Sequence, residues 1–211
     1  KNVGDMNNYG VEGDFNFVLV NNKNVQWDFN LNASYLKNTV VSLADNVKDS
    51  EAFDANGKKY EGFTSGSFFV AEGASMYTWY TYDYAGVDQQ TGKSLWYKNI
   101  LDEDGNITGR ETTDDYSKAS KYMTGMTTLA PLFGGFGTSV RAYGFDFAIN
   151  FTYQVGGKQL DGSYMTFMYS PTSGSTGFNY HVDLLDSWTT DNNTSDIPRF
   201  QYAETYNNAT S

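Results

Sequence analysis

The chain has 211 residues, of which 25 are acidic and 14 are basic, so its net charge at pH 7 is −11. An acidic chain lacks the basic surface that a polyanion requires, which excludes nucleic acid as a partner. The absence of cysteine and the presence of one histidine, His181, exclude a disulfide framework, a thiolate metal site and a multi-histidine metal site. The length suits one large domain or one piece of a larger protein.

The first predicted element is a β-hairpin in residues 9–35. Apolar and polar side chains alternate along residues 11–20, with a gap at Gly13 and a break at Val18 and Val20. They alternate without a break along residues 25–35. A strand turns successive side chains to opposite faces, so this period predicts two strands that each have one apolar and one mostly polar face. Residues 21–24, Asn-Asn-Lys-Asn, supply the turn between them.

The middle of the chain, residues 36–133, has a less regular pattern. A stretch of this length without any secondary structure is uncommon in a compact protein, so we expect several short elements in it. In chain order we predict a loop at residues 45–66, a strand at 76–84, a small hairpin at 86–97 that turns at 89–92, and a helical turn at 116–123.

A second predicted hairpin, residues 134–157, has the clearest pattern in its second half. Tyr143-Gly144 is the only link between its two strands, which is short enough for a hairpin turn. About eleven alternating residues are what a tilted strand needs to cross a bilayer. Its apolar face holds Phe145, Phe147, Ile149, Phe151, Tyr153 and Val155. Beyond it we predict a strand at 163–169, a loop at 171–177, a short helix at 180–188 and a polar tail at 191–211.

The alternation alone leaves two interpretations open. The apolar faces could meet lipid while the polar faces line a lumen, or the apolar faces could meet a protein core while the polar faces meet water. Short turns at one end of the clean hairpins and long loops at the other are typical of outer-membrane barrels. Soluble β-sandwiches have this asymmetry less often.

Four segments carry motifs that support the first interpretation. They are residues 2–12 (N-V-G-D-M-N-N-Y-G-V-E), 86–92 (G-V-D-Q-Q-T-G), 131–146 (P, then G-G-F and Y-G-F-D) and 186–199 (D-S-W-T, then I-P-R). Together, and in this order, they resemble segments of the SusC/RagA-type TonB-dependent outer-membrane transporters of Bacteroidota. Gln89 and Thr190 stand where that family usually has proline.

The resemblance implies an all-β fold, in which the chain is part of an antiparallel transmembrane β-barrel. Residues 1–211 would be an internal piece of the C-terminal half of the barrel, without signal peptide or plug and unable to close a barrel alone. Residues 36–133 and 158–211 would be mainly extracellular loop regions.

The resemblance also implies a function for the complete protein, which would be an importer in the cell outer membrane and not an enzyme. Its substrates would be glycan oligosaccharides or peptides. Its partners would be a SusD-like surface lipoprotein as lid, the TonB complex acting through the plug, and outer-membrane lipid.

Functions from other classes make different predictions. A soluble β-sandwich module for carbohydrate binding or adhesion would bury Phe147, Ile149 and Phe151 in a protein core, whereas a barrel would expose them to lipid. A β-sheet enzyme has less support, because the ionisable residues are scattered and form no catalytic constellation. His181, beside Leu and Trp residues, is interpreted as structural.

Aromatic residues of the middle region form the candidate ligand- or partner-binding site. Their rings could stack on sugars or contact a partner, or they could pack locally within the loops. They are Trp79, Tyr80, Tyr82, Tyr84, Trp96 and Tyr97.

One acidic stretch has the spacing of a calcium loop. With Gly105 at the sixth loop position, the third, fifth, seventh and twelfth positions are Asp102, Asp104, Asn106 and Glu111. The first position would be Ile100, where an acidic residue is needed. Calcium is therefore the one cofactor that the sequence suggests, and the alternative is an acidic surface turn.

Overall fold

The computed structural model describes residues 3–169 and 179–201, which form two compact units. The predicted loop at 171–177 and the end of the predicted tail, residues 202–211, lie outside the described residues. Unit 1 consists of Lys1–Glu51, Tyr60–Trp79 and Gly125–Gln159, and unit 2 consists of Ala52–Lys59, Tyr80–Thr124 and Leu160–Ser211.

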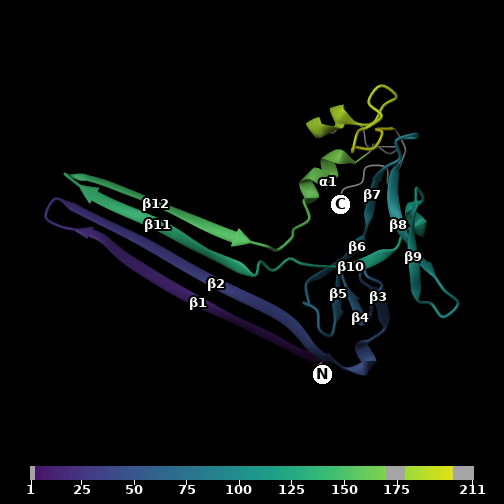
Figure 1. Cartoon of the computed structure of the whole chain (residues 1–211), viewed down its shortest axis with the longest axis horizontal. Coiled ribbons are helices and arrows are strands. Elements are labelled where there is room, and N and C mark those ends of the chain that lie inside the picture. The colour runs from purple at the N-terminus through teal and green to yellow at the C-terminus, as the bar shows by residue number, and fades with distance from the viewer. Residues whose placement is uncertain (1–2, 170–178, 202–211) are drawn as a thin grey trace. The chain divides into compact units, whose positions relative to one another are not determined.

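Unit 1 contains a four-stranded antiparallel sheet, drawn in Figure 1 as four long ribbons. Its strands are β1 (Gly4–Asn21), β2 (Val25–Leu43), β11 (Leu132–Ala142) and β12 (Phe145–Val155), in the order β1-β2-β11-β12. Both predicted hairpins are therefore present, and they lie side by side because β2 pairs with β11.

The β1–β2 hairpin is longer than predicted, because pairing continues to Gly4 and Leu43. In this outer part polar side chains hold the strands together across the ladder. The Asn38 amide donates to Asn8 Oδ1 over 2.7 Å, and Ser42 Oγ donates to Asp5 Oδ2 over 3.2 Å. In this part of β1 and β2 apolar and polar residues no longer alternate. The alternation that predicted the hairpin at 9–35 therefore could not predict that the strands continue beyond it.

The pairing register places both hairpin turns at the same end of the sheet. Ala142 faces Val25 on one side and Phe145 on the other. The Tyr143 N–H donates to the Asn24 carbonyl over 3.2 Å, which joins the two turns directly. The prediction that the short turns share one end of the hairpins is confirmed.

The turn of the β11–β12 hairpin has the backbone of a type I′ turn. Tyr143 and Gly144 both have positive φ, 51° and 87°. This turn matches the twist of a two-residue hairpin, and an L-residue such as tyrosine adopts it at some cost.

The remainder of unit 1 has shorter strands around a small core. Here β4 (Lys59–Ser65) pairs with β5 (Phe68–Ala71), and β5 pairs with the unit 1 part of β6 (Thr78–Tyr82) at Phe68 and Trp79. Buried Val40, Leu43 and Val70 pack with Val47, Phe63 and Met76.

The predicted loop at residues 45–66 was wrong. It contains the 3-10 helix η1 (Asp45–Val47), β3 (Ser50–Phe53) and all of β4. These elements are short and have few apolar residues, so no period marks them. Gly62 is informative here, because a side chain on it would collide with the backbone carbonyl of Val70. Close approach of two strands at Gly62, together with packing of Phe63 against the buried core, forms this part of the sheet.

Unit 2 contains the antiparallel sheet β7-β8-β9, formed by Tyr84–Val87, Ser94–Leu101 and Ile107–Thr113. The predicted hairpin at 86–97 and its turn at 89–92 are confirmed. The predicted strand at 76–84 is instead the two strands β6 and β7, which Asp83 separates.

A 3-10 helix, η2 (Tyr116–Lys118), occupies the start of the predicted helical turn at 116–123, and β10 (Lys121–Thr127) takes its end. Asp115 begins η2, because its carboxylate accepts the Ser117 N–H over 3.0 Å.

The predicted strand at 163–169 was wrong, because α1 (Gly162–Met168) is a helix. Asp161 Oδ1 accepts the Tyr164 N–H over 2.9 Å and caps its first turn, a local signal that outweighs the weak alternation of this stretch. The predicted helix at 180–188 is present as the 3-10 helix η3 (Val182–Asp186), whose cap is His181.

Among the described residues, no helix is long and apolar enough to span a membrane.

The turn geometry gives a first prediction. Gly144→Ala should lower the free energy of unfolding of the full-length protein by about 1–2 kcal/mol, because an L-residue is strained at this φ. Tyr143→Asn should raise it, since Asn-Gly is the preferred type I′ pair. Urea-induced unfolding measures both, and equal stability of the two variants would contradict the assignment of the turn.

Candidate functional site: the two-faced sheet and the aromatic cluster

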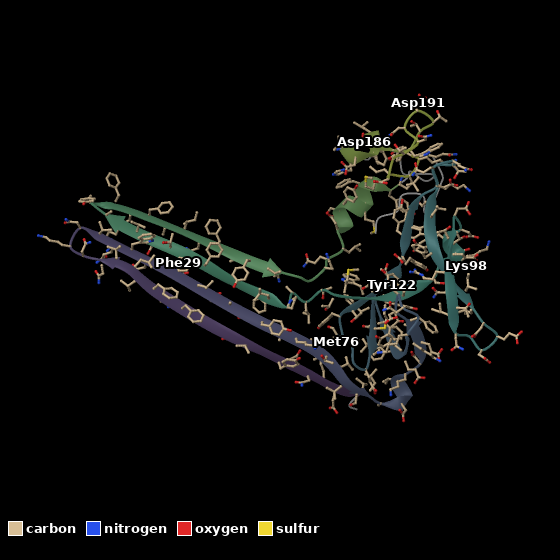
Figure 2. The ribbon with its side chains drawn as sticks, in the orientation of Figure 1. Phe29, Met76, Lys98, Tyr122, Asp186 and Asp191 are labelled. Carbon is tan, nitrogen blue, oxygen red and sulfur yellow. The ribbon has the colours of Figure 1, made fainter. Side chains whose placement is uncertain are left out.

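The register joins the apolar faces of four strands into one continuous apolar face. In one row across the sheet Phe17, Phe29, Thr138 and Ile149 pair in succession. Other members of this face are Val11, Phe15, Val25, Trp27, Leu31, Ala33, Tyr35, Leu132, Phe136, Val140, Phe145, Phe147, Phe151, Tyr153 and Val155. Figure 2 shows side chains projecting from these strands, with Phe29 labelled on β2.

Aromatic rings pack against one another on this face. Phe136 stacks on Phe151 with 5.1 Å between ring centroids, and Phe17 lies 6.2 Å from Phe29. The rings come from neighbouring strands, so their contacts help to fix the register.

The polar atoms of Trp27, Thr138 and Tyr153 on the apolar face have partners within the sheet. Trp27 Nε1 donates to Thr138 Oγ1 over 2.8 Å, and this hydroxyl donates to the Asp28 carbonyl over 2.8 Å. Tyr153 Oη donates to the Asn32 carbonyl over 3.0 Å. A face whose polar tips are satisfied internally is suited to a hydrocarbon environment.

Gly134 allows the Tyr153 contact. A Cβ on Gly134 would lie 2.7 Å from Tyr153 Oη, so the tyrosine side chain lies over the space that a larger residue would fill. The sequence placed Gly134 at the edge of the predicted hairpin but gave no reason for it; the reason is this cross-strand approach.

The apolar face has the dimensions of a bilayer core. Strands β11 and β12 have 11 residues each. At about 3.3 Å per residue and a tilt of about 40°, such strands cover about 25 Å of membrane normal. The next residue beyond Tyr35 on this face is Lys37, whose Nζ lies 5.9 Å from the centroid of the Tyr9 ring. A cation with an amphipathic ring suits the edge of the apolar band.

The opposite face of the sheet is polar and is exposed. It carries Glu12, Asp14, Asn16, Asp28, Asn30, Asn32, Ser34, Ser139, Arg141, Asp146, Asn150, Thr152 and Gln154. Near the turns Arg141 Nε contacts Asp146 Oδ1 over 2.7 Å. Acidic and amide side chains predominate, so this face suits water and neutral or cationic solutes better than an apolar core.

The exposure of the apolar face distinguishes the two sequence interpretations. Phe147, Ile149 and Phe151 are 59%, 38% and 48% exposed among the described residues. A β-sandwich would have buried them in a protein core, so the exposure favours the barrel.

Three of the six candidate aromatic residues form a packed cluster in unit 2. Trp96, which is only 7% exposed, lies 5.4 Å from Tyr84 and 6.4 Å from Tyr82 between ring centroids. Tyr116 completes the cluster at 5.0 Å from Trp96 and 4.4 Å from Tyr82. The sequence had placed Tyr116 only in a helical turn, and the Asp115 cap is what brings it here.

Burial is strong enough to change the chemistry of Tyr84. It raises the pKa of this phenol to about 12, and the Asp196 carboxylate adds to the effect. The aromatic rings of the cluster therefore pack in the interior of unit 2. These contacts support a packing role for Tyr82, Tyr84 and Trp96.

The other three candidate aromatics lie elsewhere. Trp79 belongs to unit 1, where its Nε1 donates to the Lys158 carbonyl over 2.9 Å and its ring lies 4.7 Å from that of Phe68. Tyr80 lies under Lys121 Nζ, 5.8 Å from its centroid.

Tyr97 belongs to a cation-π arrangement in unit 2. The Arg110 guanidinium lies 4.4 Å from the Tyr97 ring centroid and 5.5 Å from that of Tyr122, and it pairs with Asp83 over 2.8 Å. Figure 2 labels Tyr122. The six residues thus make these separate contacts within their own units, and their binding of a ligand or partner stays a prediction.

The acidic stretch forms the turn between β8 and β9. Asp102 Oδ1 accepts the N–H groups of Asp104 and Asn106 over 3.0 and 2.7 Å, and the amides of Asn106 hold the pKa of Asp102 below its usual range. Glu111 lies in β9, where it pairs with Lys98 Nζ over 2.7 Å. Among the described residues no three acidic or histidine side chains form a metal-binding group. The calcium site stays a prediction of the sequence.

His181 caps η3, since its Nδ1 accepts the Asp183 N–H over 3.2 Å. Its ring lies 4.8 Å from the Tyr164 ring. These contacts are those of a structural residue, as its sequence context indicated.

Comparison with known proteins gives relatives whose similarity covers almost the whole of this chain. No protein-family model matches. The chain is 28% identical over 205 residues to the TonB-dependent receptor P3 of Formosa agariphila, a match that spans 94% of this chain and 19% of that protein.

Solved structures agree with this relationship. The structure of the RagAB peptide transporter matches 98% of this chain with a TM-score of 0.71 and 25% identity, and the "closed-closed" state of the RagAB peptide importer matches it with 0.70 and 25%. In both comparisons the chain covers 21% of the other chain. The chain therefore spans about a fifth of the length of the relatives it matches.

Packing around Trp96 gives a second prediction. Trp96→Ala should lower the free energy of unfolding of unit 2 by about 3–5 kcal/mol, because it empties the centre of the cluster. Leu101→Ala, at an exposed position of the same strand, is the control and should change it by less than about 0.5 kcal/mol. Unaltered stability of Trp96→Ala would show that the cluster is not a core.

The Tyr84 phenol gives a third prediction. The folded state keeps the phenol proton up to about pH 12, whereas the unfolded chain releases it near pH 10, the usual pKa of tyrosine. The stabilisation is thus fully present below pH 10 and is lost as pH rises toward 12. Urea unfolding at a series of pH values should show the difference between the wild type and Tyr84→Phe falling across this window. A constant difference would contradict the burial of this hydroxyl.

Proposed function

We propose that the chain is a segment of a SusC/RagA-type TonB-dependent outer-membrane transporter, and that the sheet β1-β2-β11-β12 forms part of the barrel wall. The apolar face contacts lipid and the polar face lines the lumen. The turn that contains Tyr143-Gly144 lies at the periplasmic rim, and the ends of β12 and β2 near Val155 and Tyr35 lie at the outer rim.

The continuous apolar face is the observation that carries this proposal. Four strands present their apolar residues in one register, and the polar tips of Trp27 and Tyr153 are bonded within the sheet. Water would be an unfavourable environment for so large an apolar surface. Lipid on one side and an aqueous lumen on the other satisfy both faces.

For unit 2 we propose a location in the extracellular loops. It has its own packed cluster around Trp96 and its own sheet, so it does not need lipid to be stable. The residues between β2 and β11, and those after β12, would leave the membrane at the outer rim, as the long connections of barrels do.

We propose active import for the complete protein, with glycan oligosaccharides or peptides as cargo. TonB would supply energy through a plug, and a SusD-like lipoprotein would cover the extracellular side. The description of the RagAB relatives as a peptide transporter supports peptides, and the TonB-dependent receptor P3 supports the coupling to TonB. The role of this segment is structural: it forms wall, lumen lining and loop, and the reaction chemistry of an enzyme is not assigned to it.

Two neighbouring lysine substitutions on β12 test the orientation of the wall. Ile149→Lys puts a charge in the middle of the apolar face and should destabilise the full-length barrel in lipid vesicles by about 2–4 kcal/mol. Ala148→Lys puts the same charge on the polar face and should have an effect near zero.

The stability of the folded barrel is measured by urea-induced unfolding in lipid vesicles. The second measurement is substrate uptake by cells that produce each variant. The Ala148→Lys variant should still fold into the barrel, whereas the Ile149→Lys variant should lose both the folded barrel and substrate uptake. Equal stability of the two variants would overturn the lipid assignment of this face.

A further inference from the structure

Two segments of unit 2 that lie about a hundred residues apart in the chain are joined in the structure. One is the β7–β8 turn, residues 88–93, which contains part of the G-V-D-Q-Q-T-G segment. The other is residues 188–199, here named the strap, which begins in the D-S-W-T segment and ends at the arginine of I-P-R. The sequence singled out both, but nothing in it said that they touch.

The central contact is between Trp188 and Gly92. The position that a Cβ of residue 92 would occupy is filled by the Trp188 indole. Gly92 has a φ of +72°, so both its backbone conformation and the ring over it require glycine. Trp188 Nε1 also donates to the Gln89 carbonyl over 3.2 Å.

The other end of the strap is attached to the same turn. The Arg199 N–H donates to the Gly92 carbonyl over 2.8 Å, and Arg199 Nη1 donates to the Thr91 carbonyl over 3.2 Å. Carbonyls of the turn therefore accept from the first and the last residue of the strap.

Each of the two segments is also held by bonds of its own. In the turn, the Asp88 carboxylate accepts the Gln90 N–H over 2.8 Å and the Thr91 hydroxyl over 2.7 Å. In the strap, the Trp188 N–H donates to the Ile197 carbonyl over 2.8 Å, and the Ile197 N–H donates to Ser195 Oγ over 3.0 Å. Two loops that each have hydrogen bonds of their own thus meet at Trp188 and at Arg199.

We propose that the strap and the β7–β8 turn are a fastening device that makes two loops of unit 2 move as one body. Insertion of Trp188 over Gly92 is the closed state, and withdrawal of the ring releases the whole strap. This inference concerns the described residues of unit 2 alone and does not depend on the proposed transport function.

Hydrogen–deuterium exchange on the full-length protein tests the device. Gly92→Ala should speed exchange in peptides that cover residues 188–199 by at least tenfold, because the methyl group displaces the ring. Gly105→Ala is the matched control, since Gly105 is also at a positive φ, +81°, with nothing within 4 Å of its Cβ position. The Gly105→Ala variant has the same kind of backbone strain, but its new methyl group meets no side chain. It should therefore leave hydrogen exchange in the strap unchanged.

A reciprocal variant tests whether the segments are coupled. Trp188→Ala should speed exchange in the turn, residues 89–92, as well as in the strap. Trp188→Phe keeps a ring over Gly92 but loses the donor to Gln89, so its effect should be smaller. Leu185→Ala, which changes a residue 85% exposed just before the strap, should affect neither segment.

Two results would overturn the proposal. One is exchange in the strap that Gly92→Ala and Gly105→Ala alter equally. The other is a Trp188→Ala variant in which the strap exchanges faster while the turn keeps wild-type protection, because the two segments would then move independently.

Discussion

The shared register of β1, β2, β11 and β12 is the constraint on which the two-faced sheet depends. Side chains alternate with period two, so a slip of one residue on any strand would move its apolar set to the polar face. The register is fixed at the short-turn end by Tyr143-Gly144, whose backbone also bonds to Asn24. Along the strands it is fixed by side chains that reach a specific partner, as Trp27 does to Thr138 and Tyr153 does to the Asn32 carbonyl.

The composition of β11 follows from its position between β2 and β12. It has glycine at three positions, 134, 135 and 137, where its neighbours have larger side chains. Tyr153 lies over Gly134 on the apolar face, and Asn150 fills the space beside Gly137 on the polar face. Glycine usually weakens a strand, but here each missing side chain gives room to a neighbour that contacts across the ladder. The strand with the weakest alternation is thus the one that lets the two hairpins pack edge to edge.

Elements with a strong local signal could be predicted from the sequence, and elements formed by distant contacts could not. Residues 25–35 and 145–155 alternate without a break, and Tyr143-Gly144 is an evident turn, so both hairpins were found. The strands in residues 45–66 could not be predicted because they have no regular alternation: a close backbone approach at Gly62 and the packing of Phe63 against distant core residues hold them. For α1 the Asp161 cap outweighed a misleading alternation. In the candidate site, Trp96 was identified, but Tyr116 and the contact of Gly92 with Trp188 were not. The fold brings Tyr116 to Trp96 and Trp188 to Gly92. No local pattern in the sequence indicates such contacts between residues that are far apart in the chain.

The two units derive their stability from different sources. Along β12 every side chain is exposed or only partly buried, so its apolar residues depend on whatever surrounds the sheet. In unit 2, Trp96, Tyr82, Tyr84 and Tyr116 bury one another, and Arg110 is held between two tyrosine rings. A change of solvent, such as replacement of lipid by water, should therefore act on the sheet β1-β2-β11-β12 before it acts on unit 2. This difference explains how one chain can combine a sheet with an exposed apolar face and a compact unit that keeps its own core.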